Sequence, residues 1–467
     1  MRRVPSVDGN RMKNNSTPIR VERLDVDPAY AADMLRHKVV MDEERVNRIR
    51  SIINDVKVRG DAAIRDYTLK FDGVDLGSTP LRVAREEIDH AYTLASKEEV
   101  EALRAIRCRL EEVERAFLSC IKDMHIMLGS SKVSRVFKPL RSVGCYIPGG
   151  KARYASSMLM CVVPARVAGV KRVIACTPPT PNTNGDGKGN GNGKGKGSVD
   201  PLTLIAADIA GVDEVYRVGG AQAIAAMAYG SESIKPVSKI VGPGGLAVTI
   251  AKHIVSSSVA IDMLAGPTEL LVVADGTADP RYIALDLIAQ AEHAPDTLCG
   301  LITWSDTLAY KVVDELTSLL PNVSRGEIVR ESLSSNGFIA ICKDEKYAIE
   351  FANEFAPEHL QVMVGDEVKH RIIEGIDSAG MMLIGNNSPS PASDYYTGTN
   401  HVLPTMGSAK ARASLTCLDF LKPLSIVELS REDLKDIAGV VKHIARAEGL
   451  ENHYRAVESR LSIYLTD

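Results

Sequence analysis

Residues 172–218 read as a strand, a helix and a strand: RVIAC at 172–176, LTLIAADIA at 202–210 and EVYRV at 214–218. The alternation continues with a helix at 221–229, a strand at 239–241 and a helix at 247–255. Short apolar strands that alternate with helices predict a parallel sheet with both faces covered, because each crossover between parallel strands places a helix against the sheet.

A second series of the same kind follows residue 268. Strands are expected at 270–274, 300–303, 338–341, 360–364 and 382–384, with helices near 280–293, 306–319, 344–355 and 366–375. The chain therefore predicts an α/β fold with two tandem doubly wound parallel sheets, each an incomplete Rossmann-like unit. Upstream, apolar residues at three- and four-residue spacing between 40 and 122 predict scaffold helices.

These patterns divide the chain into five parts. They are an N-terminal extension and arm (1–39), the helical part of a first large domain (40–145), a cofactor-side α/β domain (146–268), the α/β part of the first large domain (269–415) and a C-terminal tail domain (416–467). A flexible glycine-rich insertion at 182–198 interrupts the cofactor-side domain. It cannot bury apolar surface, and it lacks the Gly-x-x-x-x-Gly-Lys-Ser/Thr string of a phosphate-binding loop.

Composition excludes several classes of protein. The 56 basic and 60 acidic residues give a net charge of −4, which leaves no electrostatic footprint for nucleic acid or an anionic membrane. Apolar runs such as ELLVVA at 269–274 are far shorter than the ~20 residues of a membrane span. The eight cysteines show no Cys-x-x-Cys spacing, which is typical of reduced, mostly buried thiols in a cytoplasmic protein.

The first residues lack the apolar segment of a secretory signal. Basic, Ser and Asn residues up to Lys13 fit a short transit peptide, or a disordered extension before a second possible start at Met12. We favour the extension.

One polar motif lies at the end of the helix expected near 280–293. At about 100° per residue, Gln290 and His293 point to the same side of this helix, while Glu292 faces away. Two such ligands three residues apart suit half of a metal site. A polar helix edge, on which His293 only caps carbonyl groups, explains the same pattern.

A second motif, APEHL at 356–360, closes a helix and enters a strand. Glu358 and His359 are proton acceptors suited to different steps of a reaction. Neighbouring residues of a regular strand face opposite ways, so the two need an irregular backbone to share a pocket. Glycine clusters at 149–150, 219–220 and 242–245 mark strand ends where ligands bind in parallel sheets, although no Gly-x-Gly-x-x-Gly string is present.

Together these strings resemble the histidinol dehydrogenase family, from about residue 40 to the C-terminus. The resemblance is carried by YIPGG (146–150), GGAQA (219–223), IDMLAGPTE (261–269), QAEH (290–293), APEHL (356–360), NHVLPT (400–405) and EGLENH (448–453). It implies a zinc- and NAD-dependent four-electron oxidation of L-histidinol to L-histidine through L-histidinaldehyde, the last steps of histidine biosynthesis.

The resemblance also implies a role for individual residues. One zinc ion per subunit would be held by Gln290, His293, Asp394 and His453. The proton acceptors would be Glu358 and His359. Contacts with the substrate would come from Thr268, Gln290, His293, His359, Asp394, His401, Glu448 and His453, and contacts with NAD from Tyr146 and Gln222.

The family is a homodimer whose C-terminal tail crosses over, so Glu448 and His453 would complete the site of the neighbouring subunit. One position departs from the family: Gly245 stands where an Asn often contacts the cofactor, and no contact is carried over there. Cys299 is expected in the core rather than as a nucleophile.

Two other functions stay open. A related zinc and NAD dehydrogenase could act on another primary alcohol, such as a sulfonated diol, and a non-catalytic relative could only bind zinc or serve in assembly. His401, Glu448 and His453 favour the amino-imidazole substrate, and an intact pair of Glu358 and His359 favours an enzyme.

Overall fold

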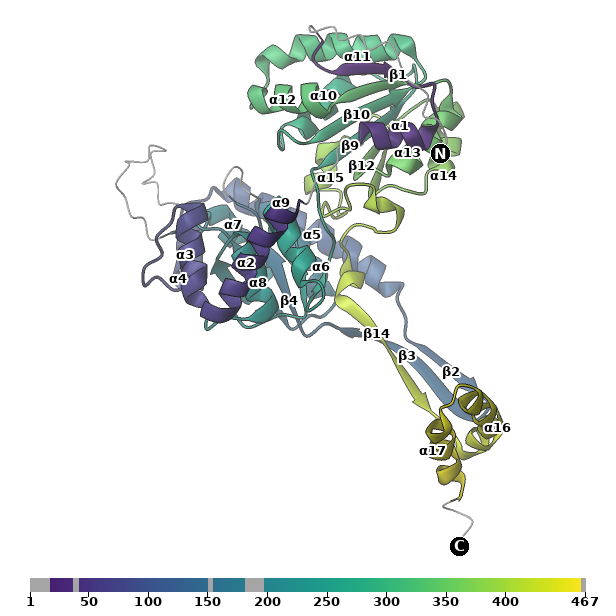
Figure 1. Cartoon of the computed structure of the whole chain (residues 1–467). Helices are drawn as coiled ribbons and strands as arrows, with labels where there is room; N and C mark the ends of the chain where they lie inside the picture. Colours follow the sequence, from purple (N-terminus) through teal and green to yellow (C-terminus); the bar gives the residue numbers. More distant parts are fainter. Residues whose placement is uncertain (1–16, 37–41, 150–153, 181–196, 463–467) are drawn as a thin grey trace.

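The computed structural model describes residues 17–36, 42–149, 154–180 and 197–462. It contains two parallel sheets and an antiparallel arm (Figure 1). The expectations for residues 1–16 and for most of the glycine-rich insertion lie outside the described residues. The two ends of that insertion meet, because Thr180 and Ser198 form an antiparallel bridge.

The first sheet has six parallel strands. Their order is β1 (Arg20–Arg23), β11 (Phe338–Ile341), β10 (Leu298–Thr303), β9 (Glu269–Ala274), β12 (His359–Met363) and β13 (Met381–Ile384). One face packs on α10 (Pro280–Ala291), α11 (Asp306–Leu319) and α12 (Gly326–Asn336), and the other on α1 (Pro28–Leu35), α13 (Glu345–Phe355) and α14 (Asp366–Gly375). Every residue of β9 and β10 is buried, which accounts for their continuous apolar sequence.

The second sheet has five parallel strands. Their order is β6 (Glu214–Arg217), β5 (Arg172–Thr177), β4 (Ser142–Tyr146), β7 (Lys239–Val241) and β8 (Ala260–Ile261). One face packs on α4 (Arg85–Ala91), α5 (Lys97–Ser119), α6 (Ala155–Val167) and α7 (Pro201–Ala210), and the other on α2 (Glu43–Arg59), α3 (Asp61–Asp72), α8 (Gly220–Tyr229) and α9 (Leu246–Val255). The predicted α/β class with two doubly wound parallel sheets is confirmed.

A slender arm projects from the body of the molecule (Figure 1). It consists of β2 (Met124–Leu128), β3 (Ser131–Pro139) and β14 (Leu421–Glu428), paired antiparallel in the order β14-β3-β2. At its far end lie α16 (Arg431–Ala447) and α17 (Glu451–Ser462). The tail was expected from the sequence, but its support by β2 and β3 was not.

The remaining elements are short: α15 (Ser390–Tyr395) and the 3-10 turns Leu320–Asn322, Ser408–Lys410 and Cys417–Phe420. Within the described ranges, no helix has the length and apolarity needed to cross a membrane. Six of the eight cysteines are buried, in line with the prediction of mostly buried thiols, and Cys108 and Cys120 are exposed. Cys299 is fully buried and its thiol contacts the carbonyl of Leu287, so it belongs to the core.

Candidate active site

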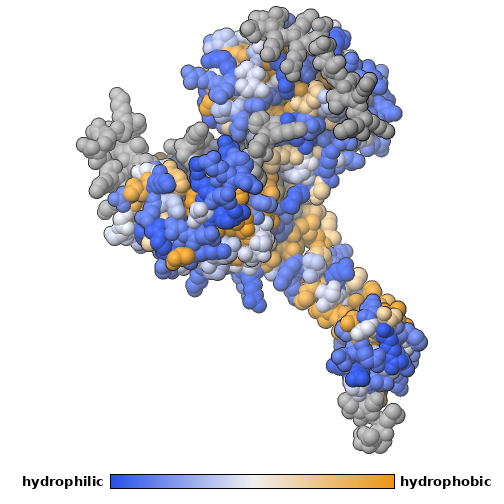
Figure 2. Space-filling model, viewed as in Figure 1, coloured by the Kyte–Doolittle hydropathy of each residue, from blue (hydrophilic) through white to orange (hydrophobic). Residues whose placement is uncertain are grey.

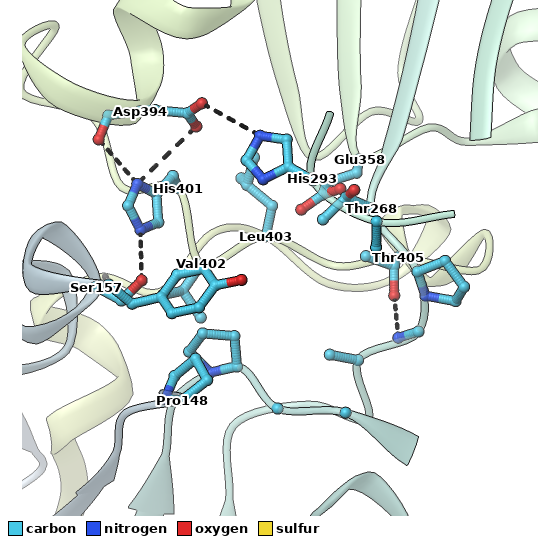
Figure 3. A pocket seen from close by; sticks show the side chains of 18 of the residues that line it. Pro148, Ser157, Thr268, His293, Glu358, Asp394, His401, Val402, Leu403 and Thr405 are labelled. Atoms are coloured by element: carbon cyan, nitrogen blue, oxygen red, sulfur yellow. Dashed lines mark hydrogen bonds and ion pairs between the residues drawn. The ribbon is translucent and has the colours of Figure 1, made fainter. Parts of the chain in front are cut away.

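A cleft of about 770 Å³ lies between the two parallel sheets. On one side it is lined by Pro148, Gly242 and Gly245, which follow strands of the second sheet. On the other side it is lined by Thr268 and Glu358, which precede strands of the first sheet (Figure 3). The cleft therefore lies at the carboxyl ends of strands in the second sheet, where ligand binding was expected, and at the amino ends of strands in the first sheet.

Because of this arrangement, helices begin at one wall of the cleft and end at the other. The N-termini of α6 and α9 open on the cleft, and neither has a side-chain cap. The C-termini of α10 and α13 point to the other wall, where Gln290 and Glu358 line the cleft. Helix N-termini favour anions and C-termini favour cations, so the second sheet suits phosphate groups and the first sheet a metal ion.

Three predicted metal ligands share the wall formed by the first sheet. Gln290 is 3 % exposed at the end of α10, and its amide oxygen is 3.5 Å from the hydroxyl of Ser390. The helix ends at Ala291, two residues earlier than predicted, but His293 remains in the following turn, with its N–H donating to the carbonyl of Gln290 at 3.2 Å. Asp394, on α15, lies with Oδ2 4.0 Å from Nε2 of His293.

The spacing of these groups fits a shared cation. The 4.0 Å between Nε2 of His293 and Oδ2 of Asp394 is within about 1 Å of the distance between two ligand atoms of one tetrahedral zinc ion. Three imidazoles, those of His293, His359 and His401, lie 3.9 to 4.0 Å from the Asp394 carboxylate. Among the described residues, no three His, Cys, Asp or Glu side chains form a complete metal set. The set within one chain is thus partial: an amide, an imidazole and a carboxylate.

Glu358 and His359 both line the cleft. The irregular backbone that they require is present, because Ala356 ends α13 in the left-handed region, with φ 43°, and β12 begins only at His359. Nδ1 of His359 is 3.3 Å from the carbonyl of Glu269, and its Nε2 is buried without a hydrogen-bond partner among the described residues. Nε2 also lies 4.0 Å from Oδ1 of Asp394.

His401 joins the two walls. Its Nδ1 is 2.9 Å from the backbone carbonyl of Asp394, and its Nε2 is 3.2 Å from the hydroxyl of Ser157 on α6 (Figure 3). Thr268 also lines the cleft, with its hydroxyl 3.2 Å from that of Thr297. The sequence alone suggests no role for Ser157, since a pair of serines at the start of an apolar helix carries no recognisable signal.

Burial shifts the pKa values of four titratable side chains on this wall. It raises the pKa of Glu358 well above its usual range and that of Asp394 to about 7. It lowers the pKa values of His359 and His401 to about 4. Near neutral pH both imidazoles are therefore uncharged, which is the form that accepts a proton or binds a metal.

The two residues predicted to contact NAD lie together but do not line the cleft. The hydroxyl of Tyr146 accepts a hydrogen bond from the N–H of Gly220, at the start of α8. Gln222 is fully buried, and both polar atoms of its amide have no partner among the described residues. A buried amide with unused donors and acceptors beside a helix N-terminus fits a polar cofactor.

Glu448 and His453 are not brought to this cleft within one chain. Glu448 caps the end of α16 and His453 lies on α17, and both are exposed at the tip of the arm (Figure 1). One chain therefore assembles Thr268, Gln290, His293, Glu358, His359, Asp394 and His401 but neither tail residue.

Comparison with known proteins identifies close relatives. The family model described as histidinol dehydrogenase matches residues 35–461. Histidinol dehydrogenase of Methanothermobacter thermautotrophicus is 42% identical over 88% of this chain and 92% of its own, and that of Heliobacterium mobile is 39% identical over 94% and 99%. The crystal structure of histidinol dehydrogenase from Elizabethkingia anophelis aligns with a TM-score of 0.87 at 31% identity, covering 96% of this chain and 99% of that one.

Proposed function

The chain belongs to the histidinol dehydrogenase family, and from this we propose that it oxidises L-histidinol to L-histidine in two successive NAD-dependent steps. The observation that carries the proposal is the meeting of two groups on one wall of the cleft. A partial metal set, Gln290, His293 and Asp394, lies beside two buried proton acceptors, Glu358 and His359.

Zinc would be held by Gln290, His293 and Asp394, with His453 of a partner subunit as the fourth ligand. Mixed nitrogen and oxygen donors suit this metal. When bound, zinc supplies an attachment point for the imidazole and amine of the substrate. The chain itself contributes the partly buried carboxylate of Asp394. Desolvation raises its pKa to about 7, so its ionised form is disfavoured until a cation such as zinc compensates.

The cofactor would lie against the second sheet. NAD, when bound, supplies the hydride acceptor for each oxidation. The uncapped N-termini of α6 and α9 would face its phosphates, while Tyr146 and Gln222 would provide polar contacts at the start of α8.

His359 is prepared to take the alcohol proton. If Nδ1 donates to the carbonyl of Glu269, at 3.3 Å, the lone pair on Nε2 is free. Nε2 has no partner among the described residues and its ring is uncharged near neutral pH, so it can accept a proton as the hydride leaves. The same atom can act again in the second oxidation.

Glu358 is prepared to activate water. Its Oε2 accepts the N–H of Glu269 at 2.7 Å, which fixes the carboxyl group. Its raised pKa brings this base closer to the pH at which it works. We assign it the hydration of the aldehyde, which must precede the second hydride transfer.

The arm supports a shared site. Several of its apolar side chains are more than half exposed: Met127, Leu128, Val427, Val440 and Ile444. Figure 2 shows hydrophobic residues along this arm. An exposed apolar surface of this kind suits a protein interface, and a second copy of the chain would both cover it and supply Glu448 and His453.

The test is product analysis with the purified protein. L-Histidinol with NAD should yield L-histidine, a chelator should abolish turnover and added zinc should restore it. A sulfonated diol offered under the same conditions should not be oxidised, because the proposed site is built to hold an imidazole and an amine. Oxidation of the diol in preference to L-histidinol would transfer the proposal to the alternative substrate.

A further inference from the structure

Glu269 is a second buried carboxylate next to the proposed base. It is the first residue of β9, which pairs with β12, and it is 3 % exposed. It follows Thr268 directly but does not itself line the cleft, and its carboxylate accepts the N–H of Glu358. No step described above uses its carboxylate.

Glu269 and Glu358 hold each other in a reciprocal pair of contacts. The N–H of Glu269 donates to Oε2 of Glu358 at 2.7 Å, and the N–H of Glu358 donates to Oε2 of Glu269 at 3.3 Å. The carbonyl of Glu269 lies 3.3 Å from Nδ1 of His359. One residue thus contacts both proton acceptors.

The carboxylate of Glu269 is itself held by backbone. Its second oxygen, Oε1, accepts the N–H of Met406 at 3.0 Å. Both oxygens therefore accept from backbone N–H groups, an arrangement that matches a carboxylate and that a side-chain amide would fit poorly. Burial raises the pKa of Glu269 to about 7, while the nearby guanidinium of Arg36 and these N–H groups oppose the shift.

A negative charge at this position strengthens the neighbouring base. Burial raises the pKa of Glu358, and the N–H of Glu269 lowers it, whereas the negative charges of the Glu269 and Asp394 carboxylates raise it further. The imidazole of His359 lies 3.8 Å from the Glu358 carboxylate. A like charge that disfavours the ionised form of Glu358 raises its affinity for a proton.

We propose that Glu269 is a positioning residue for the reaction: it clamps the carboxyl group of Glu358 across β9 and β12 and orients His359 through its carbonyl. This inference rests on the proposed function, because it presumes that Glu358 and His359 accept protons. It adds that the strength of the water-activating base depends on a residue outside the cleft lining.

The test compares Glu269→Gln and Glu269→Asp with wild type. For Glu269→Gln, kcat should fall at least ~10-fold with little change in KM for L-histidinol, a part of the ~10²–10⁴-fold contributed by general-base catalysis. The acid limb of its kcat profile should move to lower pH, because loss of the neighbouring charge lowers the pKa of Glu358. Glu269→Asp has a shorter side chain, so the clamp on Glu358 is weakened and kcat should fall. It keeps the negative charge, so the acid limb of its kcat profile should stay closer to that of wild type.

Glu114→Gln is the matched control. Glu114 is 3 % exposed, accepts the N–H of Cys417 at 2.7 Å and does not line the cleft. This variant should leave kcat and the acid limb unchanged. An unshifted acid limb in Glu269→Gln, or an equal loss of kcat in the control, would overturn the inference.

Glu358→Gln, measured in parallel, distinguishes a failure of the proposed function from a failure of the role assigned to Glu269. Full turnover by Glu358→Gln would refute the proposed function itself. An inactive Glu358→Gln together with a Glu269→Gln that behaves as wild type would refute only the role of Glu269. If Glu269→Gln does not fold, the kcat of Glu269→Asp tests the proposal instead. Wild-type turnover by Glu269→Asp would refute the proposed clamping of Glu358 by Glu269.

Discussion

The hydrogen bonding of His359 determines which of its nitrogens is available to a substrate. The carbonyl of Glu269 lies beside Nδ1, and Nε2 is directed toward Asp394 without a hydrogen-bond partner in the described part of the chain. A ring held in this way is an uncharged base with a defined tautomer.

Replacement of this base provides a test at the residue scale. His359→Asn should lower the rate of NADH formation by at least ~10²-fold, in line with the usual contribution of a general base. Its zinc content should stay at the wild-type level, since His359 is not among the proposed ligands. Both are measured on one preparation, by absorbance and by metal analysis.

His370→Asn is the control, because His370 is an exposed residue of α14 that does not line the cleft. It should match wild type in both measurements. A parallel loss of zinc and activity in His359→Asn would contradict the separate roles assigned to base and metal ligands.

At the scale of elements, most of the fold could be predicted because its strands are buried on both faces. A buried parallel strand reads as a continuous apolar run, and β9, β10 and β11 lie within three residues of their expected bounds. The edge strand β1 escaped prediction because RVER at 20–23 is only partly buried. Strands β2 and β14 are almost wholly exposed, so their apolar residues do not reveal an inner and an outer face.

The turn before α9 carries a further prediction. Gly245 occupies the N-cap of this helix with φ −67°, and nothing lies within 4 Å of the position of an added Cβ. Gly245→Asn should therefore fold without strain and cap α9, because Asn is a residue type favoured at the N-cap of a helix. In the cleft it should lower KM for NAD about 2- to 10-fold, the worth of one hydrogen bond.

Steady-state kinetics and thermal melting check this expectation. Gly77→Asn serves as the control for the kinetics alone: Gly77 has open space around it and lies outside the cleft lining, but its φ of 48° strains an added side chain and should lower the melting temperature. An unchanged KM for NAD in Gly245→Asn, as in the control, would show that the turn is not on the cofactor side of the cleft.

At the scale of the whole molecule, the site is assembled from segments far apart in the sequence. Periodicity alone placed Gln290 and His293 on one side of a helix, but it could not place Asp394, whose short helix α15 has no apolar pattern. Family resemblance supplied Asp394 and His401, and the structure brings both to the cleft. Glu269 is the last residue of IDMLAGPTE, one of the strings that carry the family resemblance. Its role could have been suspected from the sequence, because an acidic residue is unusual at the start of a buried apolar strand.

The position of the tail leads to a test of the shared site. Glu358→Gln and His453→Asn should each be inactive alone. After mixing and refolding, about a quarter of wild-type activity should return, since half of the dimers are mixed and each carries one intact site.

The control mixes Glu358→Gln with Asp394→Asn. Both residues line the cleft of the same chain, so no mixed dimer has an intact site and no activity should return. Recovery in this control, or none in the first mixture, would contradict a site completed by the partner's tail.

The number of NADH molecules formed for each L-histidinol consumed tests the account most directly. Two successive hydride transfers, with Glu358 hydrating the aldehyde between them, predict two NADH and one L-histidine per substrate. A single NADH per substrate, with aldehyde as the end product, would contradict it.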